Sequence, residues 1–182
     1  SDVELLEIDA ELRKNPQEIK SLIEKADFVF LCLPDDAARE IVALAKGTSA
    51  RIIDTSTAYR TAEGWAYGFP ELSQAHRKAI CSAKHVASPG CHASGFISLI
   101  YPLIAAEIIS ADYPLCCTSL TGYSGGGKKM IADYEHSKRS VEHDSPKLYA
   151  MGQNHKHLPE IIEQCGLNNP PIFMPIVDDF YA

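Results

Sequence analysis

The segment DFVFLCLPDDAAREIVALAK, residues 27–46, decides the fold class of this chain. Its first part, residues 27–33, is a continuous apolar run of strand length, which is typical of a strand buried on both faces of a parallel sheet. The second part begins at Pro34 and has helical spacing, and Asp35 or Asp36 is the predicted cap. A buried strand that passes directly into a helix is the repeating unit of an α/β fold.

The flanking sequence continues this alternation. Before the segment, residues 3–8 (VELLEI) alternate as a strand does, and residues 16–26 have helical spacing. After it, residues 51–56 (RIIDTS) predict the next strand, and a helix is expected from about 71 to 82. This order predicts a doubly wound, Rossmann-type parallel sheet. Ligands bind such sheets at the carboxyl ends of the strands, so the segments after Leu33 and Thr55 are expected to face a cofactor.

The second half of the chain predicts a different arrangement. A helix is expected from Pro89, a strand over 115–121, a glycine-dense turn over 122–129 that opens into a helix, and a last strand in PPIFMPIV. We therefore expect a Rossmann-type domain over 1–89 and a catalytic and oligomerisation domain of the α+β class over 90–182. No glycine-rich phosphate loop stands before Val3, and the chain stops directly after a strand, so both domains are expected to be truncated.

The composition is that of a globular protein that does not bind nucleic acid. The 182 residues carry a formal net charge of −7, whereas a nucleic-acid backbone demands a basic face. Small anionic ligands stay possible. The longest apolar run, residues 96–109, is interrupted by Pro102 and Glu107, and the N-terminus has no basic and apolar leader, so no membrane span or secretion is expected.

Six cysteines are present, but their context does not predict disulfides. Cys32, Cys116 and Cys117 lie in apolar strand-like runs, where a free cysteine acts as a small hydrophobic residue. No CxxC pair supports a structural zinc site, and no metal is expected. The expected location is the reducing cytoplasm. The six are Cys32, Cys81, Cys91, Cys116, Cys117 and Cys165.

Cys91 lies in ASPGCHASGF, residues 87–96, between a Ser-Pro-Gly turn and a long apolar run. Ser88 and Pro89 fit the N-cap and first-turn positions of a helix, which places Cys91 in the first turn. Free backbone N–H groups and the helix dipole favour an anion there, so a thiol at such a position has a lowered pKa and is a better nucleophile. The same N–H groups would hold a developing oxyanion, and Gly90 leaves the approach open. The alternative is a buried structural cysteine.

His155 and His157, in NHKHLPEI, precede Pro159, which indicates the start of another helix. A neutral imidazole within reach of Cys91 would move the protons that acyl chemistry requires. Glu160 would orient a histidine or hold a substrate amide. A helix cap, a solvated loop and a weak His-x-His metal site are the alternatives.

The stretch GYSGGGKK, residues 122–129, exposes backbone N–H groups and lets a ligand approach closely. Lys128 and Lys129 add positive charge, although the spacing does not match a P-loop. A flexible turn that caps a helix is the alternative. Arg60, in DTSTAYR, would clamp an anion or form a surface salt bridge. Together with a helix-start cysteine and a histidine pair, these features indicate acyl-enzyme chemistry on an anionic substrate.

Four motifs, taken as a set, resemble N-acetyl-γ-glutamyl-phosphate reductase in its shorter bacterial (type 2) branch. They are SPGCHASGF, LTGYSGGGKKMIADYE, HKHLPEI and YGFPEL. The resemblance extends from VELLEID to PPIFMPIVDDFY, which is nearly the whole chain. It implies an oxidoreductase of arginine biosynthesis that reduces N-acetylglutamyl 5-phosphate with NADPH to N-acetylglutamate 5-semialdehyde. It also implies the two-domain design of aspartate-semialdehyde dehydrogenase and a homodimer or homotetramer.

The resemblance assigns a role to each candidate residue. Cys91 is the nucleophile that expels phosphate and forms a thioester, and either His155 or His157 is the general acid/base, with His155 preferred. The ligand contacts that it implies are Leu33, Pro34, Ser124, Gly125 and Gly126 for NADP(H), and Arg60, Lys128 and Glu160 for the substrate. Because the phosphate cradle is missing from the sequence, this chain is expected to bind NADPH weakly or not at all.

Three other interpretations remain. A cysteine hydrolase or acyltransferase explains Cys91 and the histidines but gives the α/β half no use. An aspartate-semialdehyde dehydrogenase-type reductase is a close alternative, against which HKHLPEI argues by resemblance. A truncated, non-catalytic remnant that only dimerises would have no privileged thiol.

Overall fold

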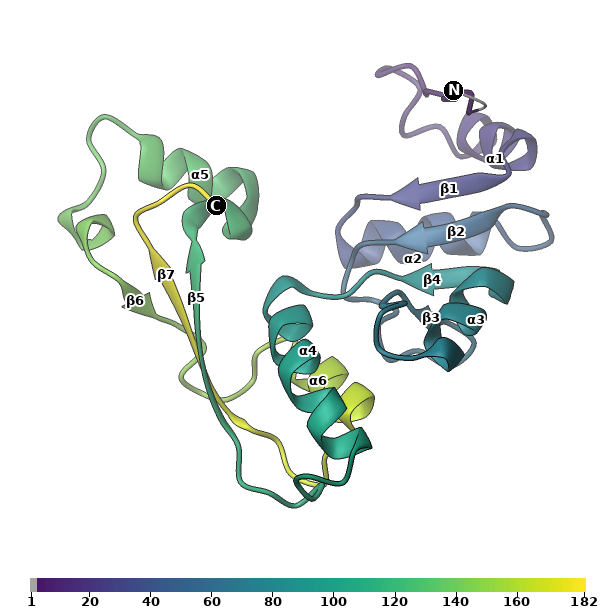
Figure 1. Ribbon diagram of the computed structural model, residues 1–182. Helices are drawn as coiled ribbons and strands as arrows, with labels where there is room; N and C mark the ends of the chain where they lie inside the picture. The colour runs from purple at the N-terminus through teal and green to yellow at the C-terminus, as the bar shows by residue number, and fades with distance from the viewer. Residues whose placement is uncertain (1–2) are drawn as a thin grey trace. The chain divides into compact units, whose positions relative to one another are not determined.

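The computed structural model describes residues 3–182, which fall into two compact units that meet along the chain at Gly90 and Cys91 (Figure 1). The first unit carries a parallel sheet and the second a mixed sheet, each with helices, and this confirms the predicted fold class. No helix within the described residues is long and apolar enough to cross a membrane.

The first unit is built on a four-stranded sheet in the order β1-β2-β4-β3, in which all neighbours are parallel. The carboxyl ends of its strands meet at one edge, where Leu31 lies beside Asp54 and Asp54 beside Ala87. The strands are β1 (Phe28–Leu31), β2 (Arg51–Asp54), β3 (Ala66–Tyr67) and β4 (His85–Ala87). The helices are α1 (Pro16–Lys25), α2 (Asp35–Leu44) and α3 (Gln74–Ser82).

Local signals fix where two of these helices begin. The Asn15 side chain accepts a hydrogen bond from the Gln17 N–H at 3.0 Å, and Pro16 occupies the first turn of α1. Ser73 accepts from the His76 N–H at 3.2 Å and so caps α3. Residues in or next to α1, α2, β1 and β2 then form one core, which contains Ile23, Leu31, Ala38, Ala45, Ala50 and Ile52.

Three expectations for the first unit are wrong. Residues 3–8 form no strand, because no strand within residues 3–182 pairs with them. β1 is not buried on both faces, since Phe28 and Phe30, which share one face of the strand, are 51% and 68% exposed. Neither Asp35 nor Asp36 caps α2: Pro34 holds the N-cap position, and the Asp35 carboxylate accepts hydrogen bonds from the N–H and hydroxyl of Thr57.

The second unit is built on a three-stranded sheet in the order β5-β7-β6. β5 (Cys116–Gly122) and β7 (Ile172–Asp178) are parallel, and β6 (Lys147–Leu148) is antiparallel to β7. The helices are α4 (Cys91–Ala105), α5 (Gly127–Glu135) and α6 (Leu158–Cys165), with 3-10 turns η1 (Tyr123–Gly126) and η2 (Val141–Asp144). α4 packs against α6 (Figure 1).

This second sheet has one buried face and one open face. Along β7, Phe173, Pro175 and Val177 are buried, whereas Ile172 is 58% exposed. Leu120 of the neighbouring β5 is exposed as well. Successive side chains of a strand point to opposite faces, so the alternation separates a face that contacts histidine rings from a face that is open.

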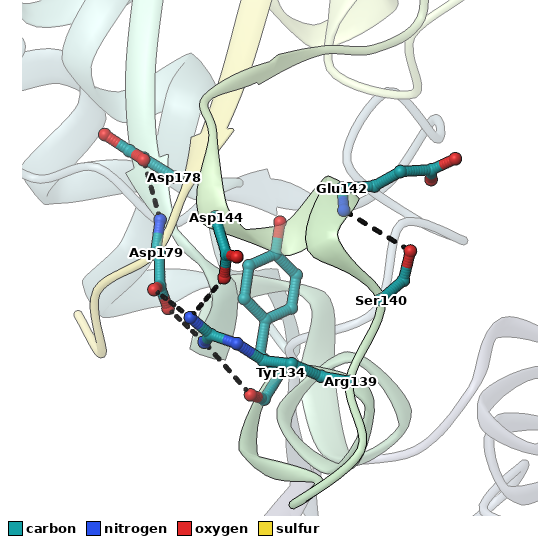
Figure 2. A network of polar contacts seen from close by, with 7 residues as sticks. All are labelled: Tyr134, Arg139, Ser140, Glu142, Asp144, Asp178 and Asp179. Carbon is teal, nitrogen blue, oxygen red and sulfur yellow. Dashed lines mark hydrogen bonds and ion pairs between the residues drawn. The ribbon is translucent and has the colours of Figure 1, made fainter.

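Arg139 joins three segments of the second unit. Its guanidinium donates to the two carboxylate oxygens of Asp179 at 2.8 and 2.7 Å, to Asp144 at 2.7 Å and to the Tyr134 carbonyl at 3.3 Å (Figure 2). Hydrogen bonding to Asp179 raises the pKa of Arg139, and the same contact lowers the pKa of the Asp179 carboxyl group. A bidentate pair of this kind fixes geometry, so it holds the end of α5, η2 and the segment after β7 together.

The cysteines are free thiols throughout the described part of the chain. Burial in α6 raises the pKa of Cys165 to about 12. Cys32 and Cys116 are exposed, which corrects the expectation that they pack as small hydrophobic residues. The reason is that Cys32 follows an open strand and Cys116 lies on the open face of β5.

Candidate functional site

Cys91 is the first residue of α4, and its side chain is exposed. The helix begins two residues later than the predicted start at Pro89, but the predicted first-turn position of Cys91 is confirmed. Ser88 does not cap the helix. Its N–H donates to the Asp54 carbonyl at 2.7 Å and its carbonyl accepts from Arg60 Nε at 3.0 Å, so its backbone ties together loops of the first unit.

His92, which directly follows Cys91, is a site residue that the sequence analysis missed. It is 7% exposed, with Nδ1 at 2.6 Å from the Ser119 hydroxyl and Nε2 at 2.8 Å from the Tyr149 hydroxyl. Burial, and next the Lys156 cation, lower the pKa of His92, so the imidazole is held neutral. Its position beside the candidate nucleophile was the one signal in the sequence.

Tyr149 follows β6, where its N–H donates to the Pro175 carbonyl at 3.1 Å. Burial, and next the charge of a Cys91 thiolate, raise the pKa of Tyr149. The phenol therefore keeps its proton near neutral pH. The same interaction means that the Cys91 sulfur lies within electrostatic range of this hydroxyl.

His155 lies beside this pair. Its Nδ1 accepts a hydrogen bond from the His157 N–H at 3.2 Å, so the proton of the neutral ring belongs on Nε2. Its ring centroid is 5.0 Å from that of Phe173 and 5.7 Å from that of His92. Burial, then His92 and Lys156, lower the pKa of His155 to about 4. His155 is therefore a neutral imidazole at physiological pH.

His157 and Glu160 form a buried pair at the start of α6. His157 is the N-cap residue, 3% exposed, and its Nε2 is 3.9 Å from Glu160 Oε1, whose side chain is 1% exposed. The pair therefore places an acidic side chain beside the His157 ring within the protein interior. The His157 ring centroid is 4.7 Å from that of His155 and 5.7 Å from that of His92, so the three histidines form one cluster.

These residues are placed by elements that lie far apart in the sequence. α4 carries Cys91 and His92, the segment after β6 carries Tyr149, and the start of α6 carries His157. Three histidines side by side could suggest a metal centre, but no group of three His, Cys, Asp or Glu side chains within residues 3–182 has the arrangement that a metal ion requires. The arrangement instead supplies a thiol, neutral imidazoles and a carboxylate-paired imidazole, which is the set that acyl transfer needs.

The glycine-rich stretch forms η1 and the start of α5. The Ser124 hydroxyl donates to the Ala182 carbonyl. A Cβ on Gly126 would collide with Met130, whose Cβ lies 2.7 Å away, and one on Gly125 would meet the Thr121 hydroxyl at 3.2 Å. The turn itself therefore needs glycine at 126, whereas at 125 the contact is only tight. The predicted substrate residue Lys128 lies in the first turn of α5 and is exposed.

Three predicted ligand residues belong to the first unit. Leu33 is exposed just beyond the carboxyl end of β1, and Pro34 is the N-cap of α2. Arg60 donates from Nη2 to the Thr55 carbonyl at 3.2 Å, besides its bond to Ser88. All three stand near the carboxyl ends of parallel strands, where ligands bind in sheets of this kind. Their roles stay predictions.

Two family models match the chain. Residues 91–181 match the model described as semialdehyde dehydrogenase, dimerisation domain, and residues 3–80 match semialdehyde dehydrogenase, NAD binding domain. The first match contains the whole histidine cluster and supports self-association. The second supports a nicotinamide cofactor.

Several relatives are named N-acetyl-gamma-glutamyl-phosphate reductase, which confirms the resemblance seen in the motifs. The chain is 47% identical over 181 residues to the protein of Chelativorans sp. and 43% identical over 183 residues to that of Trichormus variabilis. Each alignment covers 98% of this chain and 57% of the relative, so the chain spans little more than half of their length. Aspartate semialdehyde dehydrogenase II from Vibrio cholerae shares the fold, with a TM-score of 0.67 at 12% identity over 87% of this chain and 53% of that one.

Proposed function

Since the chain belongs to the semialdehyde dehydrogenase family, we propose that the protein reduces N-acetylglutamyl 5-phosphate to N-acetylglutamate 5-semialdehyde with NADPH, a step of arginine biosynthesis. The names of the relatives support the substrate. The observation that carries the proposal is the position of Cys91, at the start of α4 and within electrostatic range of Tyr149, next to a cluster of three histidines.

The first half of the reaction is an acyl transfer to Cys91. The thiol gives its proton to an imidazole, and the sulfur attacks the acyl carbon of the acyl phosphate. The bond between that carbon and the phosphate oxygen breaks, phosphate leaves with the bonding electrons, and it takes the proton from the imidazolium. N–H groups at the start of α4 would stabilise the oxyanion of the tetrahedral intermediate. The product is a thioester on Cys91.

His157 is the better candidate for the acid/base in this step. The role requires an imidazole that accepts and returns a proton near neutral pH. The lowered pKa of His155, about 4, makes this ring a poor proton acceptor. His157 has a buried acidic neighbour, since its Nε2 lies 3.9 Å from Glu160 Oε1. The resemblance left both histidines open and preferred His155, whereas the low pKa of His155 and the acidic neighbour of His157 make us propose His157 instead.

The second half returns Cys91 to its starting state. When bound, the reduced nicotinamide supplies a hydride to the thioester carbon. The resulting thiohemiacetal oxyanion re-forms its carbonyl group, and the carbon–sulfur bond breaks to release the aldehyde. The Cys91 thiolate then takes a proton from solvent. One proton has thus moved from the thiol to phosphate and one from solvent to the thiolate, which balances the reaction.

The residues proposed to contact NADP(H) fit a neutral part of the cofactor. Leu33 and Pro34 stand by the end of a parallel strand, and Gly125 and Gly126 present backbone without side chains. Asp35 and Asp36 in the first turn of α2 disfavour a phosphate at that helix start. These residues therefore suit the nicotinamide ring and its ribose, and Ser124 adds a hydroxyl.

The remaining parts of the proposal concern substrate contacts, assembly and location. Arg60 and Lys128 supply positive charge for the anionic substrate. The open face of the second sheet, with Leu120 and Ile172, is the surface proposed to join copies into a homodimer or homotetramer. The proposed boundaries are 1–89 for the cofactor domain and 90–182 for the catalytic and oligomerisation domain. A cytoplasmic location is part of the proposal and accords with free thiols.

Trapping the acyl-enzyme tests the proposal directly, because acylation needs no cofactor. The 182-residue chain is mixed with N-acetylglutamyl 5-phosphate, quenched in acid, and analysed by peptide mass spectrometry and a phosphate assay. We expect the acyl group on Cys91 with an equal amount of released phosphate, and neither with Cys91→Ser. Faster acylation by β-aspartyl phosphate would favour the aspartate-semialdehyde dehydrogenase alternative. Acyl groups spread over several cysteines at equal rates would refute the site.

A further inference from the structure

Both ring nitrogens of His92 are hydrogen-bonded to hydroxyl groups from opposite sides of β7. Nδ1 lies 2.6 Å from the Ser119 oxygen, and Nε2 lies 2.8 Å from the Tyr149 oxygen. Ser119 pairs in register with Pro175 of β7, and the Tyr149 N–H donates to the carbonyl of that same proline. The imidazole therefore spans the central strand at Pro175 and joins the segments on either side of it.

The hydrogen bonds that link Ser119, His92 and Tyr149 can run in two directions, because a neutral imidazole has one donor nitrogen and one acceptor nitrogen. If Ser119 donates to Nδ1, then Nε2–H of His92 donates to the Tyr149 oxygen, and the phenol hydrogen stays available. If Tyr149 donates to Nε2 instead, then Nδ1–H donates to Ser119, and the phenol offers only lone pairs. The two arrangements differ in which hydroxyl can donate to a third group.

Two observations favour the arrangement that leaves the phenol hydrogen available. Within residues 3–182, the Ser119 hydroxyl has His92 as its one hydrogen-bond partner, so donation to Nδ1 is how its hydrogen is satisfied. Tyr149 is in electrostatic range of the Cys91 sulfur, so its phenol hydrogen has an acceptor nearby. In this arrangement the Ser119 hydrogen and the His92 Nε2–H both have an observed acceptor, and the phenol hydrogen is left for a group on Cys91.

We propose that His92 is a positioning residue which, held by Ser119, presents the Tyr149 hydroxyl as a hydrogen-bond donor to the group on Cys91. The acceptor is the sulfur before acylation and the oxygen of the acyl group after it. The identity of that acyl group rests on the proposed function, whereas the direction of the hydrogen bonds does not. His92 acts through Tyr149 and does not itself touch the reacting atoms.

The direction is measured first, by ¹⁵N NMR of the histidine rings in the 182-residue chain, with His92 assigned by His92→Gln. We expect the Nε2–H tautomer in the unmodified chain. Ser119→Ala should lose this preference, while Thr118→Ala, the neighbouring substitution on the open face, should keep it. An Nδ1–H tautomer, or no change in Ser119→Ala, would overturn the proposal whatever the reaction is.

The consequence is measured as the rate constant of Cys91 acylation by N-acetylglutamyl 5-phosphate. Tyr149→Phe should lower it by roughly 10²-fold, as expected for loss of one donor to a developing oxyanion, and the exposed Tyr113→Phe should not. His92→Leu should lower it by about tenfold, and His92→Gln, which keeps a donor towards Tyr149, should recover most of the loss. The concentration for half-maximal rate should stay unchanged, since the donor acts on the transition state.

Failure of the two proposals is distinguishable. If the unmodified chain takes up no acyl group, the proposed function fails. The tautomer measurement alone then supports or overturns the positioning role proposed for His92. If the unmodified chain is acylated but His92→Leu and Tyr149→Phe are acylated at the same rate as the unmodified chain, the positioning role proposed for His92 is overturned and the proposed function stands. Circular dichroism of each variant shows whether a lost rate reflects a lost fold.

Discussion

The low pKa of His155 gives a test of the site electrostatics that needs no substrate. Burial is the largest cause of the shift to about 4, followed by His92 and Lys156. With that value, about 0.1% of His155 is protonated at pH 7, against roughly a quarter for an ordinary histidine. Chemical-shift titration of the ring protons, with the resonance assigned by His155→Gln, should therefore give a midpoint near 4.

The order of the causes predicts how variants move that midpoint. Phe173 packs 5.0 Å from the His155 ring, so Phe173→Leu should admit solvent and raise the midpoint more than Lys156→Gln does. Ile172→Leu, on the opposite face of the same strand, is the matched control and should leave it in place. A midpoint at about 6 or above in the unmodified chain would show that the ring is solvated, and the assignment of roles to His155 and His157 would then lose its basis.

The same shift has a consequence for stability. The folded pKa of His155 lies below the unfolded value, so between pH 6.5 and about 4 the unfolded chain binds more protons than the folded one. The contribution of this residue is thus present above the unfolded pKa and is lost as the pH falls through that window. Urea denaturation at a series of pH values should show a free energy of unfolding that decreases as the pH is lowered from 6.5 to about 4. The His155→Gln variant should show a smaller decrease over the same pH range.

Further substitutions test the packing that supports the site. Phe173→Ala should lower the free energy of unfolding of the second unit by about 3–5 kcal/mol, because this ring is 1% exposed. The matched control Val141→Ala, at a side chain that is 82% exposed, should change it by less than about 0.5 kcal/mol. Alkylation of buried Cys165 against urea concentration reports on this unit alone. Gly122→Ala should destabilise the second unit, because a Cβ at this position would overlap backbone atoms. Gly95→Ala should stabilise the second unit by roughly 0.5–1 kcal/mol, because this residue lies inside α4 with open space around it. Arg139→Gln should speed amide hydrogen exchange in residues 178–181, because the bidentate contact to the segment after β7 is lost, and equal exchange rates would refute that role.

The helix starts of the site were predictable because their signals are local. Ser88 and Pro89 before an apolar run indicated a helix whose first turn holds Cys91, although Ser88 does not cap it, and Pro159 indicated one that begins near His157. Such signals depend on a few neighbouring residues, and the structure places both helices within two residues of the expectation.

His92, Ser119 and Tyr149 were not predictable, because their contacts depend on strand pairing. Ser119 and the segment of Tyr149 flank β7 only in the order β5-β7-β6, and no local pattern encodes that order. The exposure of β1 was misjudged for a related reason. An apolar run specifies a strand, but whether both of its faces are covered depends on elements elsewhere in the fold.

The site geometry separates the two halves of the proposed reaction. Every side chain assigned a chemical role in thioester formation, from Cys91 through Tyr149 to Glu160, belongs to residues 91–182. The first unit supplies Leu33 and Pro34 as proposed cofactor contacts, and Arg60 as a proposed contact to the charge of the substrate. The distances that join the acylation residues lie within one compact unit, so they do not depend on how a dinucleotide is held. Substitutions at Leu33 or Pro34 should therefore leave the rate of Cys91 acylation unchanged and affect only its reduction. Equal loss of both steps would mean that the first unit also shapes the thiol site, and the division of labour inferred from these contacts would be wrong.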